Sequence, residues 1–245
     1  MSIDPALPAL LQFGDGLFPA GGFAHSFGLE TYAQQGRLRG AADLDALIAA
    51  HLDGAAGPAD AVAVALAVRG AGSADVAALV ALDDRLDAMK CVPEFRSASL
   101  QMGRQTLRVA AALGGGLGGP LEAPHVTRPD GVIAALSRAV AEGLTPGHHA
   151  VVFGAALGCA GASAAAAATV YLHSTAALLV GAALRLISLG QVEGQRVLAA
   201  QRSRIARLAA AAAAARGADD MWSFNPGLEV AGIRHATLEM RLFRS

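Results

Sequence analysis

The sequence predicts an all-α protein: a single compact helical domain of about ten helices with an alanine-rich core. Alanine supplies 59 of the 245 residues, and alanine and leucine together supply 91. Both are strong helix formers, whereas valine, isoleucine and threonine number only 30 and aromatic residues make up 4% of the chain. A chain of this length can bury a large core without disulfide or metal staples. No repeat and no linker divides it, so we expect one domain over residues 1–245.

The N-terminal elements are predicted from apolar spacing and from turn residues. The apolar run 3–12 predicts a short first helix. Four glycines and a proline in residues 13–23 predict a glycine-rich loop. A second helix is expected over residues 24–35, ended by Gly36. Leucine and isoleucine at helical spacing predict the next helix over residues 40–53.

Prolines, glycines and capping residues punctuate the middle of the chain. The dipeptide Gly57-Pro58 is expected to break it. Residues 61–68 predict a buried helix, because alanine and not a polar residue alternates with valine there. Ser73 is the expected N-cap of the following helix, and Pro93 fits the first turn of the one after it. That helix is expected to place Gly103 at a contact point.

The second half begins with a glycine- and proline-rich segment, residues 114–129. Its glycines match the dinucleotide-binding spacing G-x-G-x-x-G, but that motif needs a preceding strand and a following helix, and Pro120 follows instead. We therefore expect a plain loop. Further helices are expected over residues 129–142, 147–160, 164–188, 190–215 and 226–240.

The charged residues exclude several functions. Eighteen of the 19 basic residues are arginine, and the single lysine, Lys90, is not part of a phosphate-binding Gly-Lys-Ser/Thr loop. A net charge of −1 gives no bulk attraction to nucleic acid or to anionic lipid, so neither is an expected partner. The N-terminus has no basic region and carries Asp4 and Pro5, which predicts a cytoplasmic protein.

A charge-free stretch of 42 residues lies between Glu142 and Arg185. Its hydropathy raises the alternative of a membrane protein spanning residues 147–188. The stretch is mostly alanine and glycine, however, and it lacks flanking aromatic belts and a basic cluster on one side. We expect two buried core helices here and no membrane contact.

No group of residues in the sequence has the pattern of a catalytic or metal site. The histidines are isolated, apart from the adjacent pair His148-His149, and no H-E-x-x-H or C-x-x-C motif is present. We therefore expect no metal ligands. An alternative is a small helical enzyme that uses His25, Ser26 and Glu30 beside the glycine-rich loop, which would require these side chains to converge in a pocket.

Two arginine-containing segments suggest contacts with other proteins. The predicted helix 190–215 carries several arginines against one acid, which fits either a solvated face or a docking face for an acidic partner. In the tail 237–245, Leu242 and Phe243 stand between Arg241 and Arg244. Such a pair suits an anchor that orders on a partner, and it equally suits a tail that folds back onto its own core.

Four blocks of this sequence, in the same order, resemble the urease accessory protein family UreF. They are Leu10–Gln12 with Phe18–Glu30; Glu94–Ser99 with Met102 and Gly103; Arg185–Gln191 with Gln195; and Arg241–Ser245 with His235 upstream. The resemblance implies an all-α homodimer with no catalytic site and no cofactor. It further implies that the chain bridges UreD (also called UreH) to the nickel-carrying GTPase UreG, in an assembly that delivers nickel to apo-urease.

The resemblance also implies which residues would bind these partners. Arg241, Leu242, Phe243, Arg244 and Ser245 would lie in the tail that orders against UreD. The surface that meets UreG would contain Glu30, Tyr32, Gln191 and Gln195. The two glutamines are one helical turn apart and share a face, so their amides can offer directional hydrogen bonds without the desolvation cost of a charge. The alternative for Glu30 and Tyr32 is that they only cap and pack the second helix.

Overall fold

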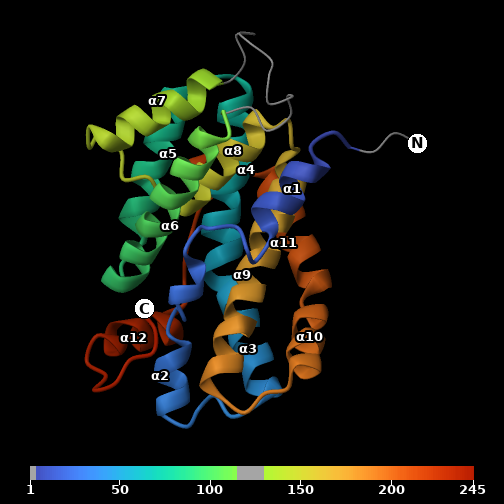
Figure 1. Cartoon of the computed structure of the whole chain (residues 1–245), viewed down its shortest axis with the longest axis vertical. Coiled ribbons are helices and arrows are strands. Elements are labelled where there is room, and N and C mark those ends of the chain that lie inside the picture. Colours follow the sequence, from blue (N-terminus) through green and yellow to red (C-terminus); the bar gives the residue numbers. More distant parts are fainter. Residues whose placement is uncertain (1–3, 115–129) are drawn as a thin grey trace.

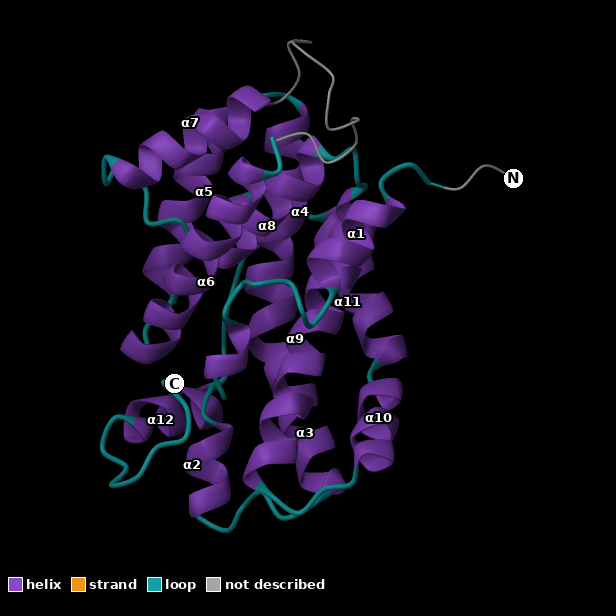
Figure 2. Cartoon of the chain, viewed as in Figure 1, coloured by secondary structure: helices purple, strands orange, loops and turns teal. Residues whose placement is uncertain are grey.

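In the computed structural model, the described residues are 4–114 and 130–245, and they fold into helices with no strand among them (Figure 1, Figure 2). The predicted all-α class is therefore confirmed. The expected loop 114–129 and its glycine motif lie outside the described residues, apart from Gly114. The α-helices are α1 (Leu7–Gly14), α2 (Leu29–Gln34), α3 (Ala41–His51), α4 (Val62–Gly72), α5 (Val76–Met89), α6 (Pro93–Ala112), α7 (Asp130–Ala141), α8 (His149–Cys159), α9 (Ala164–Leu186), α10 (Gln191–Ala200), α11 (Arg202–Ala214) and α12 (Pro226–His235).

Helices α4, α8 and α9 form the centre of the molecule. In Figure 1, α5, α6 and α7 cover one side of them, and α1, α10 and α11 cover the other. Helices α2 and α12 pack on each other at the lower end. Eight consecutive residues of α8, Ala150–Leu157, are buried, which explains why this segment carries no charge.

Glycines allow α8 to approach α4 closely. A Cβ atom added at Gly154 would lie 2.5 Å from the carbonyl oxygen of Val64, and one added at Gly158 would lie 2.7 Å from that of Val68. Both pairs are spaced by one helical turn, so the two backbones touch along a continuous seam. Small residues in this region therefore serve core packing. The expectation that α6 places Gly103 at a contact is confirmed as well, since its Cα faces the backbone of Gly147.

The expected break at Gly57-Pro58 is wrong, because the chain continues through a π-helix, η2 (Leu52–Ala61), that joins α3 to α4. The segment 222–224 runs along this helix: the backbone N–H of Phe224 is donated to the carbonyl oxygen of Gly54 at 2.7 Å, and that of Trp222 is donated to the carbonyl oxygen of Pro58 at 3.3 Å. These contacts with a segment that is distant in sequence hold the proline-containing helix in place.

Two predicted helix starts near the N-terminus are also wrong. Helix α1 begins at Leu7 and not at residue 3, because Pro8 is tolerated only in a first turn. The expected helix 24–35 is replaced by a 3₁₀ turn, η1 (Gly22–Ala24), an extended segment and then α2. The backbone N–H groups of Ser26 and Phe27 are donated to the C-terminal tail, so they are not part of a helix. The expected end at Gly36 is confirmed by its left-handed φ of 66°.

Three further boundaries differ from the prediction. Asp75, not Ser73, caps α5, since its carboxylate accepts the N–H of Ala78 at 2.9 Å. The Ser73 hydroxyl donates back to carbonyl groups of α4. The expected helix 190–215 is divided into α10 and α11 at the buried Gln201. The last helix ends at His235 because the chain then turns back toward α2. Pro93 stands in the first turn of α6, as predicted.

One described helix, α9, is long and apolar enough to cross a membrane by length and composition alone, with a mean hydropathy of 1.5. Half of its most apolar window is buried inside the protein, where it packs on α4, α11 and α1. A core helix passes the same test, so this gives only weak support to the membrane alternative.

Candidate functional site

The C-terminal tail is docked on the body of the protein. Gln34 of α2 donates its side-chain amide to the carbonyl oxygen of Met240 at 2.8 Å. The backbone N–H of Arg244 is donated to the carbonyl oxygen of Ala24 at 2.9 Å. At the end of the tail, the carbonyl oxygen of Ser245 accepts three hydrogen bonds, from the two N–H groups of Ser26 and Phe27 and from the hydroxyl of Ser26. The tail therefore pairs with α2 and with the segment before it.

The central contact of the tail is the carboxylate of Glu30, in the first turn of α2. Its two oxygens accept the backbone N–H groups of Leu242 at 2.6 Å and of Phe243 at 3.0 Å. The same carboxylate lies 2.9 Å from the ring of His235, and Glu30 is buried. An ionised carboxylate that accepts several N–H groups can be stable in a buried position. Glu30 thus fixes the tail by its backbone.

Residues of the docked tail alternate between buried and exposed positions. Phe243 is 4% exposed and Ser245 is buried, whereas Leu242 is 61% exposed and the side chain of Arg244 is in solvent. This alternation is the consequence of an extended backbone, whose successive side chains point to opposite sides. The two alternatives left open by the sequence are therefore compatible: one set of side chains anchors the tail internally, while the other set faces outward.

Arg185, near the end of α9, joins the tail to the glycine-rich loop. Its guanidinium group lies 4.1 Å from the ring centre of Phe243 and 3.7 Å from that of Phe23. It also donates a hydrogen bond of 2.7 Å to the carbonyl oxygen of Phe23. Burial lowers the pKa of Arg185, which still carries its charge at neutral pH. Arg185 belongs to one of the blocks that resemble UreF, but the resemblance implied no role for it.

The residues of the alternative enzyme site bind the tail instead of forming a pocket. The ring nitrogen Nδ1 of His25 lies 2.9 Å from the hydroxyl of Ser245, and Ser26 and Glu30 bind tail backbone as described above. Burial, followed by the nearby charge of Arg244, lowers the pKa of His25 to about 4, so the ring is neutral at pH 7. None of the three lines the cavity described below. This alternative therefore has no support in the geometry.

The four residues expected on one surface fall into two groups. Glu30 and Tyr32 are buried in α2, where the hydroxyl of Tyr32 lies beside Gly227 of α12. Gln191 and Gln195 are exposed on α10. In Figure 1, α2 and α10 lie on opposite sides of α9. The structure thus brings the two glutamines together and places Glu30 with the tail.

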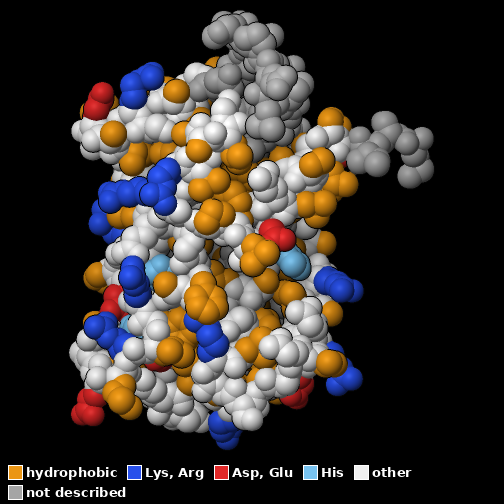
Figure 3. All heavy atoms as spheres, viewed as in Figure 1, with side chains coloured by type: hydrophobic (Ala, Val, Ile, Leu, Met, Phe, Trp, Pro, Cys, Tyr) orange, Lys and Arg blue, Asp and Glu red, His pale blue; other side chains and the backbone are white. Residues whose placement is uncertain are grey.

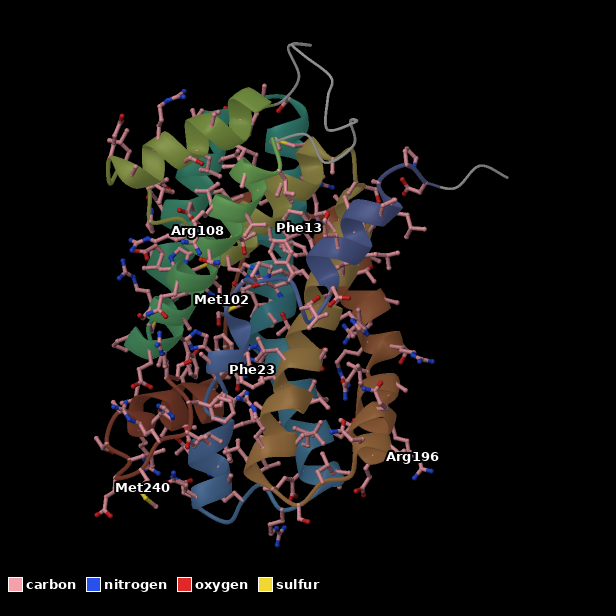
Figure 4. All side chains as sticks on the ribbon, in the orientation of Figure 1. Phe13, Phe23, Met102, Arg108, Arg196 and Met240 are labelled. Carbon is pink, nitrogen blue, oxygen red and sulfur yellow. The ribbon has the colours of Figure 1, made fainter. Side chains whose placement is uncertain are left out.

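A cavity of about 650 Å³ opens beside the glycine-rich loop, and all residues from Phe13 to Phe23 contribute to its wall. Its lining is mostly apolar and comes from the loop, α6 and α9, with further residues from α3, η2, α5, α8 and α12. Figure 4 labels Phe13, Phe23 and Met102 around it, and Figure 3 shows hydrophobic side chains around a hollow near the middle of this face. The predicted loop therefore has a definite structural role, as one side of an apolar cavity.

Polar groups line part of this cavity. Lys90, the single lysine, forms an ion pair of 2.7 Å with Asp60 of η2. His51 and His149 also reach the cavity, and burial lowers the pKa of each to about 4, although the charge of Asp60 acts in the opposite direction. Burial likewise raises the pKa of Tyr171 well above its ordinary value. These groups are neutral at pH 7, apart from the ion pair.

The sequence did not indicate the roles of His235 and Glu94. His235 lies between the carboxylates of Glu30 and Glu94, which come from α2 and α6. No local spacing links these three positions, although His235 and Glu94 each fall in a block that resembles UreF. The described residues contain no group of three or more His, Cys, Asp or Glu side chains arranged to hold a metal ion.

These features define an all-α protein, over the described residues, in which side chains of His25, Ser26 and Glu30 hold its own C-terminal tail. The sequence profile of the UreF family matches residues 38–202. A "Urease accessory protein UreF" from Paracoccus denitrificans (strain Pd 1222) is 36% identical over 239 residues, which cover 96% of this chain and 94% of the relative. Another of that name, from Rhodopseudomonas palustris (strain BisA53), is 33% identical over 240 residues, which cover 98% and 93%.

The chain belongs to the UreF family of urease accessory proteins. The resemblance inferred from four sequence blocks is confirmed over nearly the whole chain. Because the family name and the names of the relatives are those of an accessory protein, the expectation that the chain is not an enzyme is confirmed too.

Proposed function

We propose that the chain is a scaffold in the maturation of urease, acting in the cytoplasm as a homodimer. It bridges UreD (UreH) and the GTPase UreG, and the assembly delivers nickel, its cargo, to apo-urease. Membership of the UreF family supports a role in urease maturation. The docked tail is the single observation that carries the more specific proposal, because it offers a preformed binding surface.

The outer side of the tail is the proposed UreD-binding surface. Leu242 is exposed there between Arg241 and Arg244, whose side chains are both in solvent. An apolar anchor flanked by arginines is typical of an interaction hot spot. Because Glu30 and the Ser26 segment already hold the tail backbone, a partner would not have to order it, and the entropic cost of binding falls.

The UreG-binding surface is proposed to include Gln191 and Gln195 on α10. Both amides are exposed, they lie one turn apart, and Val192 between them is 66% exposed. Neutral hydrogen-bonding groups around an apolar side chain suit reversible docking, since no charge must be desolvated. Glu30 and Tyr32, although buried, would act on partner binding through the tail and through α12.

Co-purification tests the proposal. The full chain, co-expressed with UreD and UreG from the same operon, should retain both proteins on an affinity column. A chain without Arg241–Ser245 should lose UreD while it keeps helical circular dichroism. If the full chain retains neither partner, the scaffold function is wrong. If the shortened chain still retains UreD, the assignment of the tail is wrong.

A further inference from the structure

His235 is the last residue of α12, and its ring is fully buried between two carboxylates. Its Nε2 lies 2.9 Å from an oxygen of Glu30, and its Nδ1 lies 2.6 Å from an oxygen of Glu94. Both ring nitrogens are thus within hydrogen-bonding distance of an acceptor. Three separate helices meet at this one imidazole.

A neutral imidazole has one N–H group and one lone pair, while an ionised carboxylate can only accept. If the ring were neutral, one carboxylate oxygen would face a lone pair at hydrogen-bonding distance. With both carboxylates ionised, both contacts are hydrogen bonds only when the ring carries two protons. The geometry around His235 therefore corresponds to an imidazolium between two carboxylates.

The same two carboxylates bind the tail. Glu30 accepts the N–H groups of Leu242 and Phe243, and Glu94 lies 3.1 Å from the guanidinium group of Arg241. The backbone contacts of Leu242 and Phe243 and the side-chain contact of Arg241 therefore depend on how His235 orients these carboxylates. The proton that the ring carries lies at the centre of this arrangement.

Charge balance leads to the same protonation state. The charged groups that meet at the ring are Glu30 from α2, Glu94 from α6 and Arg241 from the tail. Arg234, beside His235 on α12, is exposed to solvent. Two carboxylates and one guanidinium leave one unbalanced negative charge in a largely buried site. A proton on His235 neutralises it, whereas a neutral ring would leave it uncompensated.

We propose that His235 is a positioning residue for the tail: its doubly protonated ring fixes Glu30 and Glu94, and these hold residues 241–243 on the body. Docking of the tail takes up this proton, so docking is favoured at lower pH and is weakened as the ring loses the proton at higher pH. The inference rests on the proposed function in one respect, namely that the docked tail is the form that presents Leu242 to UreD.

Nuclear magnetic resonance on the full chain, labelled with ¹⁵N-phenylalanine, tests the proposal. The amide of Phe243, assigned with a Phe243→Leu variant, donates directly to Glu30 and reports on docking. As the pH rises from mildly acidic to mildly alkaline, its signal should move toward the position of an unstructured residue. In His235→Gln, which cannot take up a proton, this pH dependence should disappear. His173→Gln, at an exposed histidine of α9, should titrate like the wild type.

Glu94→Gln separates a proton-dependent role from a merely structural one. An amide can accept from a ring N–H or donate to a bare ring nitrogen, so the tail of this variant should stay docked over the whole pH range. The proposal is overturned if the wild-type Phe243 signal does not change with pH, or if His235→Gln keeps the transition. It is also overturned if Glu94→Gln titrates as the wild type does.

Binding of UreD, measured at the same pH values, distinguishes this inference from the proposed function. If the Phe243 signal titrates while UreD binding stays constant, His235 positions the tail but the tail is not the UreD-binding surface. If removal of the tail abolishes UreD binding while Phe243 does not titrate, the function stands and the role of His235 is wrong.

Discussion

The guanidinium group of Arg185 lies 4.1 Å from the ring centre of Phe243 and 3.7 Å from that of Phe23. One side chain of the central helix α9 therefore connects the docked tail to the glycine-rich loop. These are two of the segments that resemble UreF most specifically. The contact explains how a tail and a loop far apart in sequence form one face of the molecule.

Arg185→Gln should loosen both segments. The substitution removes two cation–π contacts, each worth about 1 kcal/mol at a partly exposed site, together with a hydrogen bond. Tryptic cleavage after Arg241 should become several-fold faster, because cleavage requires the tail to leave the body. Arg196→Gln, at an exposed arginine of α10 (Figure 4), is the matched control and should be cleaved like the wild type. Equal cleavage rates in both variants would contradict the role of Arg185.

The glycine seam between α4 and α8 predicts opposite effects for two Gly→Ala substitutions. Gly154→Ala should lower the free energy of unfolding by about 1–3 kcal/mol, because the new methyl group meets the backbone of Val64. Gly181→Ala in α9 should raise it by about 0.5–1 kcal/mol through helix propensity, because the added methyl group would meet no atom within 4 Å beyond the nearby backbone of its own helix. Urea unfolding measures both values. A similar effect of the two substitutions would show that the seam is not tightly packed.

Stability should fall as the pH is lowered from about 6.5 to about 4. His51 and His149 have an ordinary pKa of 6.5, and burial lowers each to about 4 in the folded protein. Between these values the unfolded chain binds more protons than the folded one, so acid favours unfolding; above 6.5 the effect vanishes.

The measurement is thermal unfolding over this pH range. In a double variant, His51→Gln with His149→Gln, stability should fall less steeply in acid. The loss of stability that remains should include the contribution of His25. His173→Gln, whose side chain is exposed, should retain the full decrease. An unchanged slope in the double variant would mean that these two rings do not carry the acid sensitivity.

The exposed glutamine pair predicts a specific loss of UreG binding. Gln191→Ala with Gln195→Ala should weaken it about tenfold, the loss expected for roughly 1.4 kcal/mol of directional hydrogen bonding. Circular dichroism and UreD binding should stay unchanged, because neither side chain packs on the body. Gln101→Ala, at an exposed glutamine of α6, controls for loss of a surface amide. Undiminished UreG binding in the double variant would remove α10 from the proposed interface.

Local signals in the sequence predicted the helical class and many helix positions. Pro93 in a first turn and Gly103 at a contact were predicted because each depends on nearby residues and on helical spacing. The break expected at Pro58 was wrong, and the helix there accepts the backbone N–H groups of Trp222 and Phe224, which no local pattern connects to it.

The candidate site could be predicted only in part for the same physical reason. The apolar pair Leu242 and Phe243 in a terminal tail indicated an anchor, but their opposite orientation depends on the extended pairing with the Ser26 segment. The meeting of His235 with Glu30 and Glu94 results from the packing of three helices. Such tertiary contacts produce no regular spacing of residues that could be recognised in the sequence.

The most direct test of the proposed scaffold is the retention of UreD by a Leu242→Asp variant in an affinity column experiment. Leu242 is 61% exposed and its backbone N–H, not its side chain, binds Glu30, so the fold and the docked tail should persist. Leu144→Asp, at a leucine that is 63% exposed between α7 and α8, is the matched control. The account predicts that Leu242→Asp loses UreD while Leu144→Asp retains it. Full retention of UreD by Leu242→Asp would contradict the assignment of the tail as the UreD-binding surface.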